Sequence, residues 1–333
     1  MKTRRIVPLV GIALLATLAA GCASTSGPVN LAIVNKVAPP VPGGIKIGKA
    51  AIPPAAAATP NCGDPTASLR PPAVMPTPGQ MPTGSTMAKI QARGYLIAGV
   101  DQNTDLFGYR NPKDNTIEGF DIDMVHDVAQ AIFGDPNKVV FKAITSAQRI
   151  PVLTGPNPAV DLVARTFTIN CARLQQVAFS TVYFQASRQV LVPKTSTVQN
   201  FAQLGGKKVC ATTGSDSLGQ GQGQANAPIP VAVNDWSDCL VMLQQGEVDA
   251  VSTDNTILAG METQDPNTKI VGPSIAPEPY GIAMPKADND FVGFVNGVLQ
   301  QIRTNGSWTA SYGTWVQDKL GATPAPPPPA YEN

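Results

Sequence analysis

Histidine and charged residues are scarce in this chain, and each shortage excludes a class of function. His126 is the one histidine among 333 residues, which leaves no basis for a histidine-dependent catalytic triad or a histidine-rich metal site. Lys, Arg, Asp and Glu together make up 14% of the chain, with a net charge of +1. Without a basic patch there is no electrostatic case for binding nucleic acid.

Cysteine occurs five times, and no two cysteines are close enough in sequence to form the C-x-x-C pair of a metal site. We therefore expect no metal and no other cofactor. Apart from Cys22 there are four, an even number that fits disulfides in an exported protein, and three pairings of them are possible. Cys210 follows a strand-like segment and Cys239 opens a helical one in the same candidate lobe. We therefore predict the disulfides Cys210–Cys239 and Cys62–Cys171.

The N-terminus has the three zones of a cleaved secretory signal: basic residues, the apolar run 6–20, and the small residue Gly21 before Cys22. The run is too short for a comfortable transmembrane helix, which needs about 20 residues. Residues 19–22 also resemble the lipobox of bacterial lipoproteins, whose cysteine takes a diacylglyceryl group. We predict a signal peptide over residues 1–21 and lipidation of Cys22, which would anchor the protein to the outer face of the cell membrane. An ordinary signal peptide with a chance cysteine is the alternative.

Proline is concentrated towards both ends of the chain, with 13 of its 32 prolines in residues 28–82 and five in residues 324–329. Because proline cannot continue a helix or a central strand, these segments are expected to be irregular. We predict a Pro-rich linker over residues 22–84, extended as a stalk without a core of its own, and a Pro-rich tail over residues 321–333.

Between these ends, strands and amphipathic helices alternate, which predicts mostly parallel sheets. The first series has strands at 96–100, 139–143 and 160–164 and helices at 121–133 and 147–153. The second has strands at 208–211, 229–233 and 248–252, a helix starting at Ser215 and a helix at 238–245. Two copies of one plan predict two lobes, with lobe 1 from residues 85–186 and 277–320 and lobe 2 from residues 187–276. The segments 183–193 and 280–285 are long enough for two extended crossings between them.

Six short segments, in the correct order, resemble the polar amino-acid-binding family of ABC-transport receptors, the family of the glutamine- and glutamate-binding proteins. They are Gly119–Asp123, Thr168–Ile169 with Arg173, Phe179–Ser180, Asp249–Val251 with Asp254, Tyr280–Ile282, and Asn305–Trp308 with Trp315. The resemblance implies an α/β, two-lobed, type II periplasmic-binding-protein fold. In that fold the second lobe is inserted in the first and a two-strand hinge joins them, so that the cleft closes around a ligand.

The resemblance also implies which residues bind an α-amino acid. Arg173 matches the position whose guanidinium holds the α-carboxylate, and Asp254 matches the carboxylate that holds the α-ammonium. A plain helix cap is the alternative role for Asp254. Thr166 and Thr168 match a strand end that offers a carbonyl and a hydroxyl to the ligand.

Ser215 matches a turn whose amides face the ligand carboxylate at a helix N-terminus. The next residue, Asp216, departs from the family, which usually has a small residue there. If the Asp216 side chain caps the helix, the site is intact, and if it points inward, it would repel an anion.

The ligand side chain is the remaining question. Thr104 and Ser146 stand where the family has an aromatic clamp, whereas the resemblance implies that Arg149 and Arg165 lie close to the cleft. Two extra cations near the side-chain pocket favour an acidic ligand electrostatically. We therefore predict glutamate or aspartate first and glutamine or asparagine next, with two lobe-surface arginines as the alternative.

These patterns predict an extracytoplasmic, lipid-anchored monomer that binds a small polar amino acid and delivers it to the permease and ATPase subunits of an ABC importer. One alternative is an amino-acid-sensing subunit for a membrane signalling protein. Another is a dehydratase-like enzyme on the same fold, but an enzyme would need an acid or base with a tuned pKa near its substrate. The candidate cleft residues are already assigned to the ligand, so we do not expect an enzyme.

Overall fold

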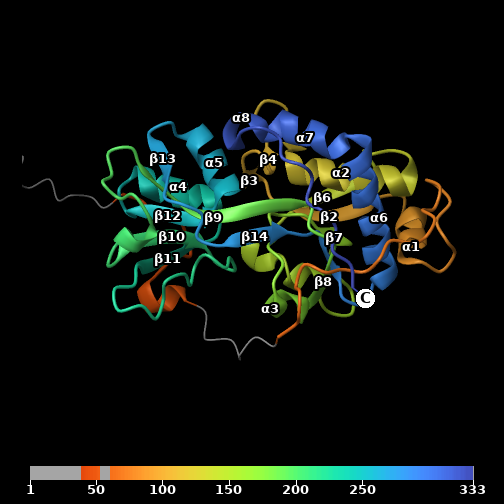
Figure 1. Ribbon diagram of the computed structural model, residues 1–333, viewed down its shortest axis with the longest axis horizontal. Coiled ribbons are helices and arrows are strands. Elements are labelled where there is room, and N and C mark those ends of the chain that lie inside the picture. Colours follow the sequence, from red (N-terminus) through yellow and green to blue (C-terminus); the bar gives the residue numbers. More distant parts are fainter. Residues whose placement is uncertain (1–38, 53–60, 333) are drawn as a thin grey trace, which may run out of the picture. The chain divides into compact units, whose positions relative to one another are not determined.

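The computed structural model describes residues 39–52 and 61–332 (Figure 1). The predicted signal peptide and the lipidation site Cys22 lie outside these residues. Within the described part, no helix combines the length and the apolar character needed to cross a membrane.

A five-stranded sheet forms the centre of lobe 1. Its order is β6-β2-β7-β15-β8, with β2 parallel to β6 and β7, and with β15 antiparallel to β7 and β8. The strands are β2 (Leu96–Val100), β6 (Val139–Ala143), β7 (Leu162–Val163), β8 (Val177–Phe179) and β15 (Ala283–Pro285). A separate antiparallel sheet contains β3 (Asn103–Thr104), β4 (Gly108–Arg110) and β5 (Ile117–Glu118).

Five helices from separate parts of the described chain pack on lobe 1. They are α1 (Thr86–Arg93), α2 (Phe120–Phe133), α6 (Asn289–Asn305), α7 (Ser307–Trp315) and α8 (Gln317–Leu320). Helix α2 forms because its buried apolar residues recur at helical spacing, and it ends where Gly134 takes a left-handed conformation. Gly119, just before α2, lies so close to Phe107 that a Cβ would come within 2.4 Å of the Phe107 carbonyl. The start of α2 is thereby fixed against the core.

Lobe 2 is built on a second sheet, with the order β1-β11-β10-β12-β9-β13 and β14 paired with β9. Its strands are β1 (Lys46–Ile47), β9 (Phe184–Pro193), β10 (Lys208–Thr212), β11 (Ile229–Val233), β12 (Ala250–Asp254), β13 (Thr268–Val271) and β14 (Pro277–Tyr280). Strand β10 is parallel to β11 and β12, whereas β9 is antiparallel to β12 and β13. Helices α4 (Trp236–Gln244) and α5 (Asn255–Gln264) contribute buried residues to its core.

Strands β9 and β14 connect the two lobes. The first half of β9 pairs with β14, and from Arg188 onward β9 pairs with β12 inside the second sheet. Figure 1 shows β9 running from one sheet to the other with β14 beside it. The first crossing thus lies where the sequence predicts it, and the second precedes the predicted segment 280–285.

Both predicted disulfides are present, Cys62–Cys171 and Cys210–Cys239.

Two predicted helices are wrong. The segment 147–153 contains only two short 3-10 helices, η3 (Ser146–Gln148) and η4 (Pro151–Leu153), because Pro151 has no N–H with which to continue an α-helix. After Ser215 the chain forms a series of turns as far as residue 226. Three glycines between residues 219 and 223 weaken helix formation there, so Ser215 and Asp216 lie in a turn and not at a helix start.

The interpretation of residues 61–84 as an extended stalk is also wrong. Met81 is buried in the core of lobe 1, and Met75 packs against that core. The Ser68 hydroxyl donates a hydrogen bond to the Phe179 carbonyl at 2.6 Å. The C-terminal tail lies beside this segment, where the Ser68 N–H donates a hydrogen bond to the Ala330 carbonyl at 3.1 Å. Contacts with lobe 1, which local proline content does not reveal, fix both segments.

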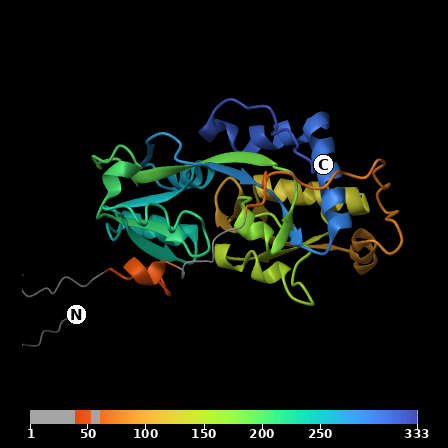
Figure 2. The same cartoon turned by 60° about the horizontal axis from the view of Figure 1, so that its bottom comes forward.

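Residues 46–51 of the predicted linker add to lobe 2. Strand β1 pairs antiparallel with β11 at the sheet edge, and Ala51 is buried in the core behind it. Figure 2 shows this segment in red beside the strands of lobe 2. The predicted linker therefore contacts lobe 2 through β1 and lobe 1 through Cys62.

Candidate functional site

A cavity between the lobes collects most of the residues expected to bind a ligand. It is lined by Arg149, Thr166, Thr168, Arg173, Ser215, Asp216, Ser217, Trp236, Thr253, Asp254, Ile257 and Glu278. Six of the seven predicted ligand-binding residues are among them, and Arg165 is not. The lining comes from lobe 1, from lobe 2 and from the connecting strand β14, so a ligand here would contact all three.

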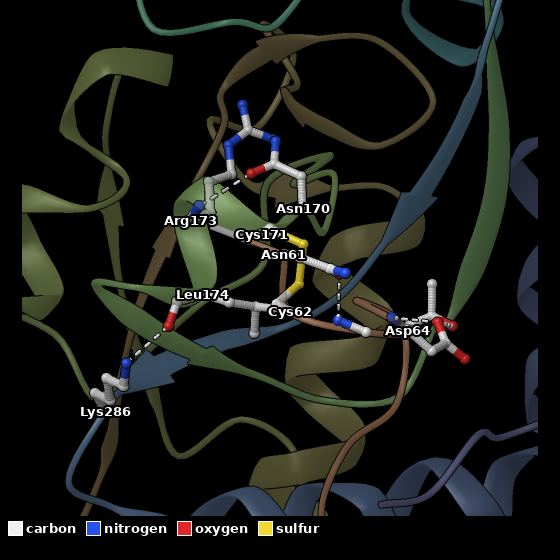
Figure 3. The surroundings of a disulfide bond; sticks show 10 residues. Asn61, Cys62, Asp64, Asn170, Cys171, Arg173, Leu174 and Lys286 are labelled. Carbon is white, nitrogen blue, oxygen red and sulfur yellow. Dashed lines mark hydrogen bonds between the residues drawn. A yellow bond between two sulfur atoms is a disulfide. The ribbon is translucent and has the colours of Figure 1, made fainter. Parts of the chain in front are cut away.

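Arg173 lies on α3 (Cys171–Leu174), a single helical turn fixed at its start in two ways. The Asn170 side chain accepts a hydrogen bond from the Arg173 N–H at 2.9 Å, and Cys171 is bonded to Cys62 (Figure 3). The guanidinium is buried, lies over the Phe167 ring and donates from Nη1 to the Thr168 carbonyl at 2.6 Å. Arg173 is thus a positioned cation in the wall of the cavity.

Arg149 is a second buried cation of the cavity, and its hydrogen bonds all go to backbone carbonyls. Nε donates to Ser146, Nη1 donates to Thr166 at 3.1 Å, and Nη2 donates to Gly214 in lobe 2 at 3.1 Å. Burial, together with the charges of Arg173 and Arg165, lowers the pKa of Arg149 well below its ordinary value. The lobe 1 wall therefore has an excess of positive charge that an anion would stabilise.

Arg165 lies in the interior of lobe 1, and the structure does not bring it to the cavity. Its side chain is fully buried, and its Nη2 forms an ion pair with Asp101 at 2.8 Å. Nε donates to the Ile144 carbonyl at 2.7 Å and Nη1 donates to the Ser146 hydroxyl at 2.6 Å. Because Asp101 neutralises the Arg165 guanidinium within lobe 1, the electrostatic argument for an acidic ligand loses one of its two arginines.

Asp254 ends β12 at the edge of the cavity and is 6% exposed. Its side chain makes no capping bond to α5, which excludes the plain helix-cap alternative. Instead Oδ2 accepts a hydrogen bond from the Tyr280 hydroxyl at 2.6 Å. Burial first, and the nearby Glu278 second, raise the pKa of Asp254 to about 7. A cation placed against Asp254 would relieve both effects.

Glu278 is a cavity residue that the sequence reasoning missed. It is 2% exposed on β14, accepts a hydrogen bond from the Thr168 hydroxyl at 2.6 Å and forms an ion pair with Arg188 of β9. The available signal was an acid two residues before Tyr280 in an otherwise apolar and proline-rich segment. Glu278 thereby ties the strands between the lobes to the ligand cavity.

Thr166 has an unusual backbone conformation, with φ at 39°, and its N–H donates to the buried Asp121 carboxylate at 2.8 Å. The Thr166 carbonyl already accepts a hydrogen bond from Arg149, so the group that Thr166 can offer to a ligand is its hydroxyl. That hydroxyl is buried and has no hydrogen-bond partner among the described residues. Because an unsatisfied buried hydroxyl is costly, Thr166 is suited to bond a ligand in the cavity.

Ser215 and Asp216 lie in a turn between β10 and β11, so no helix N-terminus faces the cavity there. The Ser215 hydroxyl donates to the Thr212 carbonyl at 2.8 Å. Asp216 points towards lobe 1: Oδ1 pairs with Arg173 Nη2 at 2.9 Å, and Oδ2 accepts from Asn170 at 3.0 Å. Of the two alternatives for Asp216, the inward orientation is the one observed.

The sequence and the fold both have known relatives. Residues 96–318 match the model of the family described as bacterial extracellular solute-binding proteins, family 3. The ABC transporter glutamine-binding protein GlnH of Bacillus subtilis is 36% identical over 234 residues, which cover 70% of this chain and 85% of that protein. The glutamine-binding protein of Geobacillus stearothermophilus is 37% identical over 208 residues, or 62% of this chain and 79% of the relative.

Solved structures of similar proteins agree with the architecture. An ancestral arginine-binding protein bound to glutamine superposes with a TM-score of 0.62 at 30% identity and covers 67% of this chain and 98% of its own. The solute receptor for L-cysteine of Neisseria gonorrhoeae gives a TM-score of 0.67 at 24% identity, with 72% and 98% covered. The expected two-lobed, type II periplasmic-binding-protein fold is confirmed.

Proposed function

Since the chain belongs to family 3 of the bacterial extracellular solute-binding proteins, we propose that it is the receptor that captures a polar α-amino acid for an ABC importer. The observation that carries the proposal is the pair of opposite charges on facing walls of one buried cavity. Arg149 and Arg173 belong to lobe 1, whereas Asp254 belongs to lobe 2. A zwitterionic ligand has the matching pair of charges and would bridge the lobes.

In this arrangement the α-carboxylate binds Arg173, which keeps unused N–H donors on a guanidinium already fixed by Thr168. The α-ammonium binds Asp254, whose carboxylate is held by Tyr280. The free hydroxyl of Thr166 provides a further hydrogen bond. The Thr166 contact satisfies a buried hydroxyl that has no partner among the described residues, whereas at Arg173 the ligand carboxylate would compete with Asp216.

For the ligand side chain, we propose an amide first and an acid second, the reverse of the order favoured by the sequence alone. Arg165 is neutralised by Asp101, and Arg149 already donates to several carbonyls. Carboxylates of Asp216, Asp254 and Glu278 line the same cavity, and a second negative charge on the ligand would add to them. The two relatives above, whose names state glutamine binding, support glutamine as the first candidate.

The rest of the proposal follows from the sequence and the family. Lipidation of Cys22 would hold the receptor at the outer face of the membrane, where a permease with its ATPase receives the ligand. We propose a monomer, and we propose binding without chemistry. Burial and the nearby Glu278 account for the raised pKa of Asp254, and a ligand ammonium beside it would lower that pKa again.

Isothermal titration calorimetry of the purified protein against the twenty standard amino acids tests this proposal. We expect glutamine or asparagine to bind most tightly, glutamate and aspartate next, and lysine and arginine not at all, because a third cation beside Arg149 and Arg173 would be desolvated and unpaired. Binding of no amino acid would remove the proposed function. Glutamate binding more tightly than glutamine would restore the acidic preference and leave the transport role intact.

A further inference from the structure

An ion pair joins the lobes at the mouth of the cavity, and it involves a residue for which the family resemblance offers no role. Asp216 belongs to the turn after β10 in lobe 2, and its Oδ1 lies 2.9 Å from Nη2 of Arg173 in lobe 1. Its other oxygen accepts from Asn170, the residue that caps the helix of Arg173. The Asp216 side chain is therefore held in place at both oxygens, although it is 33% exposed.

The charge of Asp216 reaches both arginines of the cavity. It pairs directly with Arg173, and it also acts on Arg149, whose hydrogen bonds otherwise go to neutral carbonyls. Arg165 is separately neutralised by Asp101. Asp216 is thus a lobe 2 carboxylate that, like Asp254, offsets the positive charge of the lobe 1 wall.

From this geometry we propose that Asp216 is a specificity-determining residue, which selects against ligands that bring a second carboxylate. The inference rests on the proposed amino-acid receptor function. Any amino acid must place its α-carboxylate at Arg173 beside a carboxylate that the protein already supplies. An acidic side chain would need Arg149 as well, and the negative charge of Asp216, which acts on Arg149, would repel that second carboxylate. The amide of glutamine or asparagine has no charge to be repelled and keeps its hydrogen bonds.

The inference predicts two separable effects of neutralising Asp216. All amino acids should bind somewhat more tightly, because one competitor for Arg173 is lost. Acidic ligands should gain more, because two cations then face two ligand carboxylates. For a partly exposed pair we expect a gain of about threefold for glutamine and at least about tenfold for glutamate.

The test is calorimetric titration of wild type and Asp216→Asn with glutamine and glutamate. Asp216→Ala accompanies it, since an asparagine amide could itself bond the ligand carboxylate. Asp318→Asn is the matched control, because Asp318 is an exposed aspartate on α8 that does not line the cavity. The ratio of glutamate to glutamine affinity is the decisive quantity, since a merely structural role would change both affinities together.

A ratio that shifts towards glutamate in both variants, and not in the control, supports the inference. Equal gains for the two ligands would mean that Asp216 only competes for the shared α-carboxylate contact, and this would overturn the specificity role. Weaker binding of both ligands would make Asp216 a supporting contact and also overturn it. If wild type binds neither these ligands nor any other amino acid, the receptor function fails first and the inference falls with it.

Discussion

The two walls of the cavity differ in charge. Lobe 1 presents Arg149 and Arg173, both buried and both over the Phe167 ring, whereas lobe 2 presents Asp216 and Asp254. Opposite walls attract each other directly, as the pair between Asp216 and Arg173 shows. A ligand must therefore replace contacts that the protein makes with itself, which favours a molecule carrying both charges over a simple anion or cation.

Arg173 and Arg165 provide a second contrast within lobe 1. Both are buried arginines with a carboxylate partner, but the partner of Arg165 lies in its own lobe and that of Arg173 lies across the cavity. A partner in the same lobe makes an arginine part of the core. A carboxylate partner across the cavity leaves the arginine available to a ligand whenever the lobes separate.

The largest effect on affinity should come from Arg173→Ala. A ligand carboxylate would then be desolvated without its cation, and breaking one side of a buried pair costs about 3 to 5 kcal/mol. We expect every amino-acid ligand to bind at least about a hundredfold more weakly in calorimetry, with an unchanged circular dichroism spectrum. Arg70→Ala, at an exposed arginine beside Tyr331, is the control. A loss of tenfold or less would show that the lobe 1 cation is not the carboxylate site.

Protonation of Asp254 should have a smaller effect on ligand affinity. Its pKa of about 7 means that lowering the pH through 7 protonates the carboxylate that would hold the ammonium. Affinity should fall by about tenfold for each pH unit below 7, and Asp254→Asn should bind weakly with little pH dependence. Calorimetry between pH 5.5 and 8.5 provides the measurement. The facing groups Glu278, Tyr280 and Arg188 are unchanged in that variant.

The stability of the ligand-free protein should change with pH in the opposite sense. The folded pKa of Asp254 lies above its ordinary value of 3.8, so its favourable contribution is fully present below about 4 and is lost as the pH rises through about 7. Asp121 is raised to about 7 mainly by burial and acts in the same direction. Thermal unfolding should show the ligand-free protein losing stability over the range in which binding improves. Stability that rises with pH over this range would contradict the raised pKa of Asp254.

Local patterns in the sequence predicted the parts of the fold that local physics determines. Strands 96–100, 139–143 and 229–233 have the predicted bounds because short apolar runs between turns suffice to specify them. The helix expected at Ser215 is absent, since glycines break the apolar pattern that a helix needs. The packing of Met81 against lobe 1 was also unpredictable, because it depends on residues distant in the sequence.

The site shows the same division between local and distant information. The family resemblance found Arg173, Asp254 and Thr168, which line the cavity. It did not separate Arg149 from Arg165, because both are arginines near a strand or a turn and their partners come from other parts of the chain. Glu278 was missed for a related reason, since its role depends on the pairing of β9 with β14.

The smallest effect on affinity should come from Arg165→Gln, and it tests the contrast between the two arginines most directly. Removing the guanidinium leaves Asp101 as an unpaired buried charge, so the free energy of unfolding should fall by about 3 to 5 kcal/mol in urea denaturation. The folded fraction should bind glutamine and glutamate within about twofold of wild type, because Arg165 does not line the cavity. Adding Asp101→Asn should recover part of the lost stability, since the unpaired charge is then gone. A selective loss of glutamate binding without loss of stability would instead make Arg165 a ligand contact, and the division of lobe 1 into a core arginine and a cavity arginine would fail.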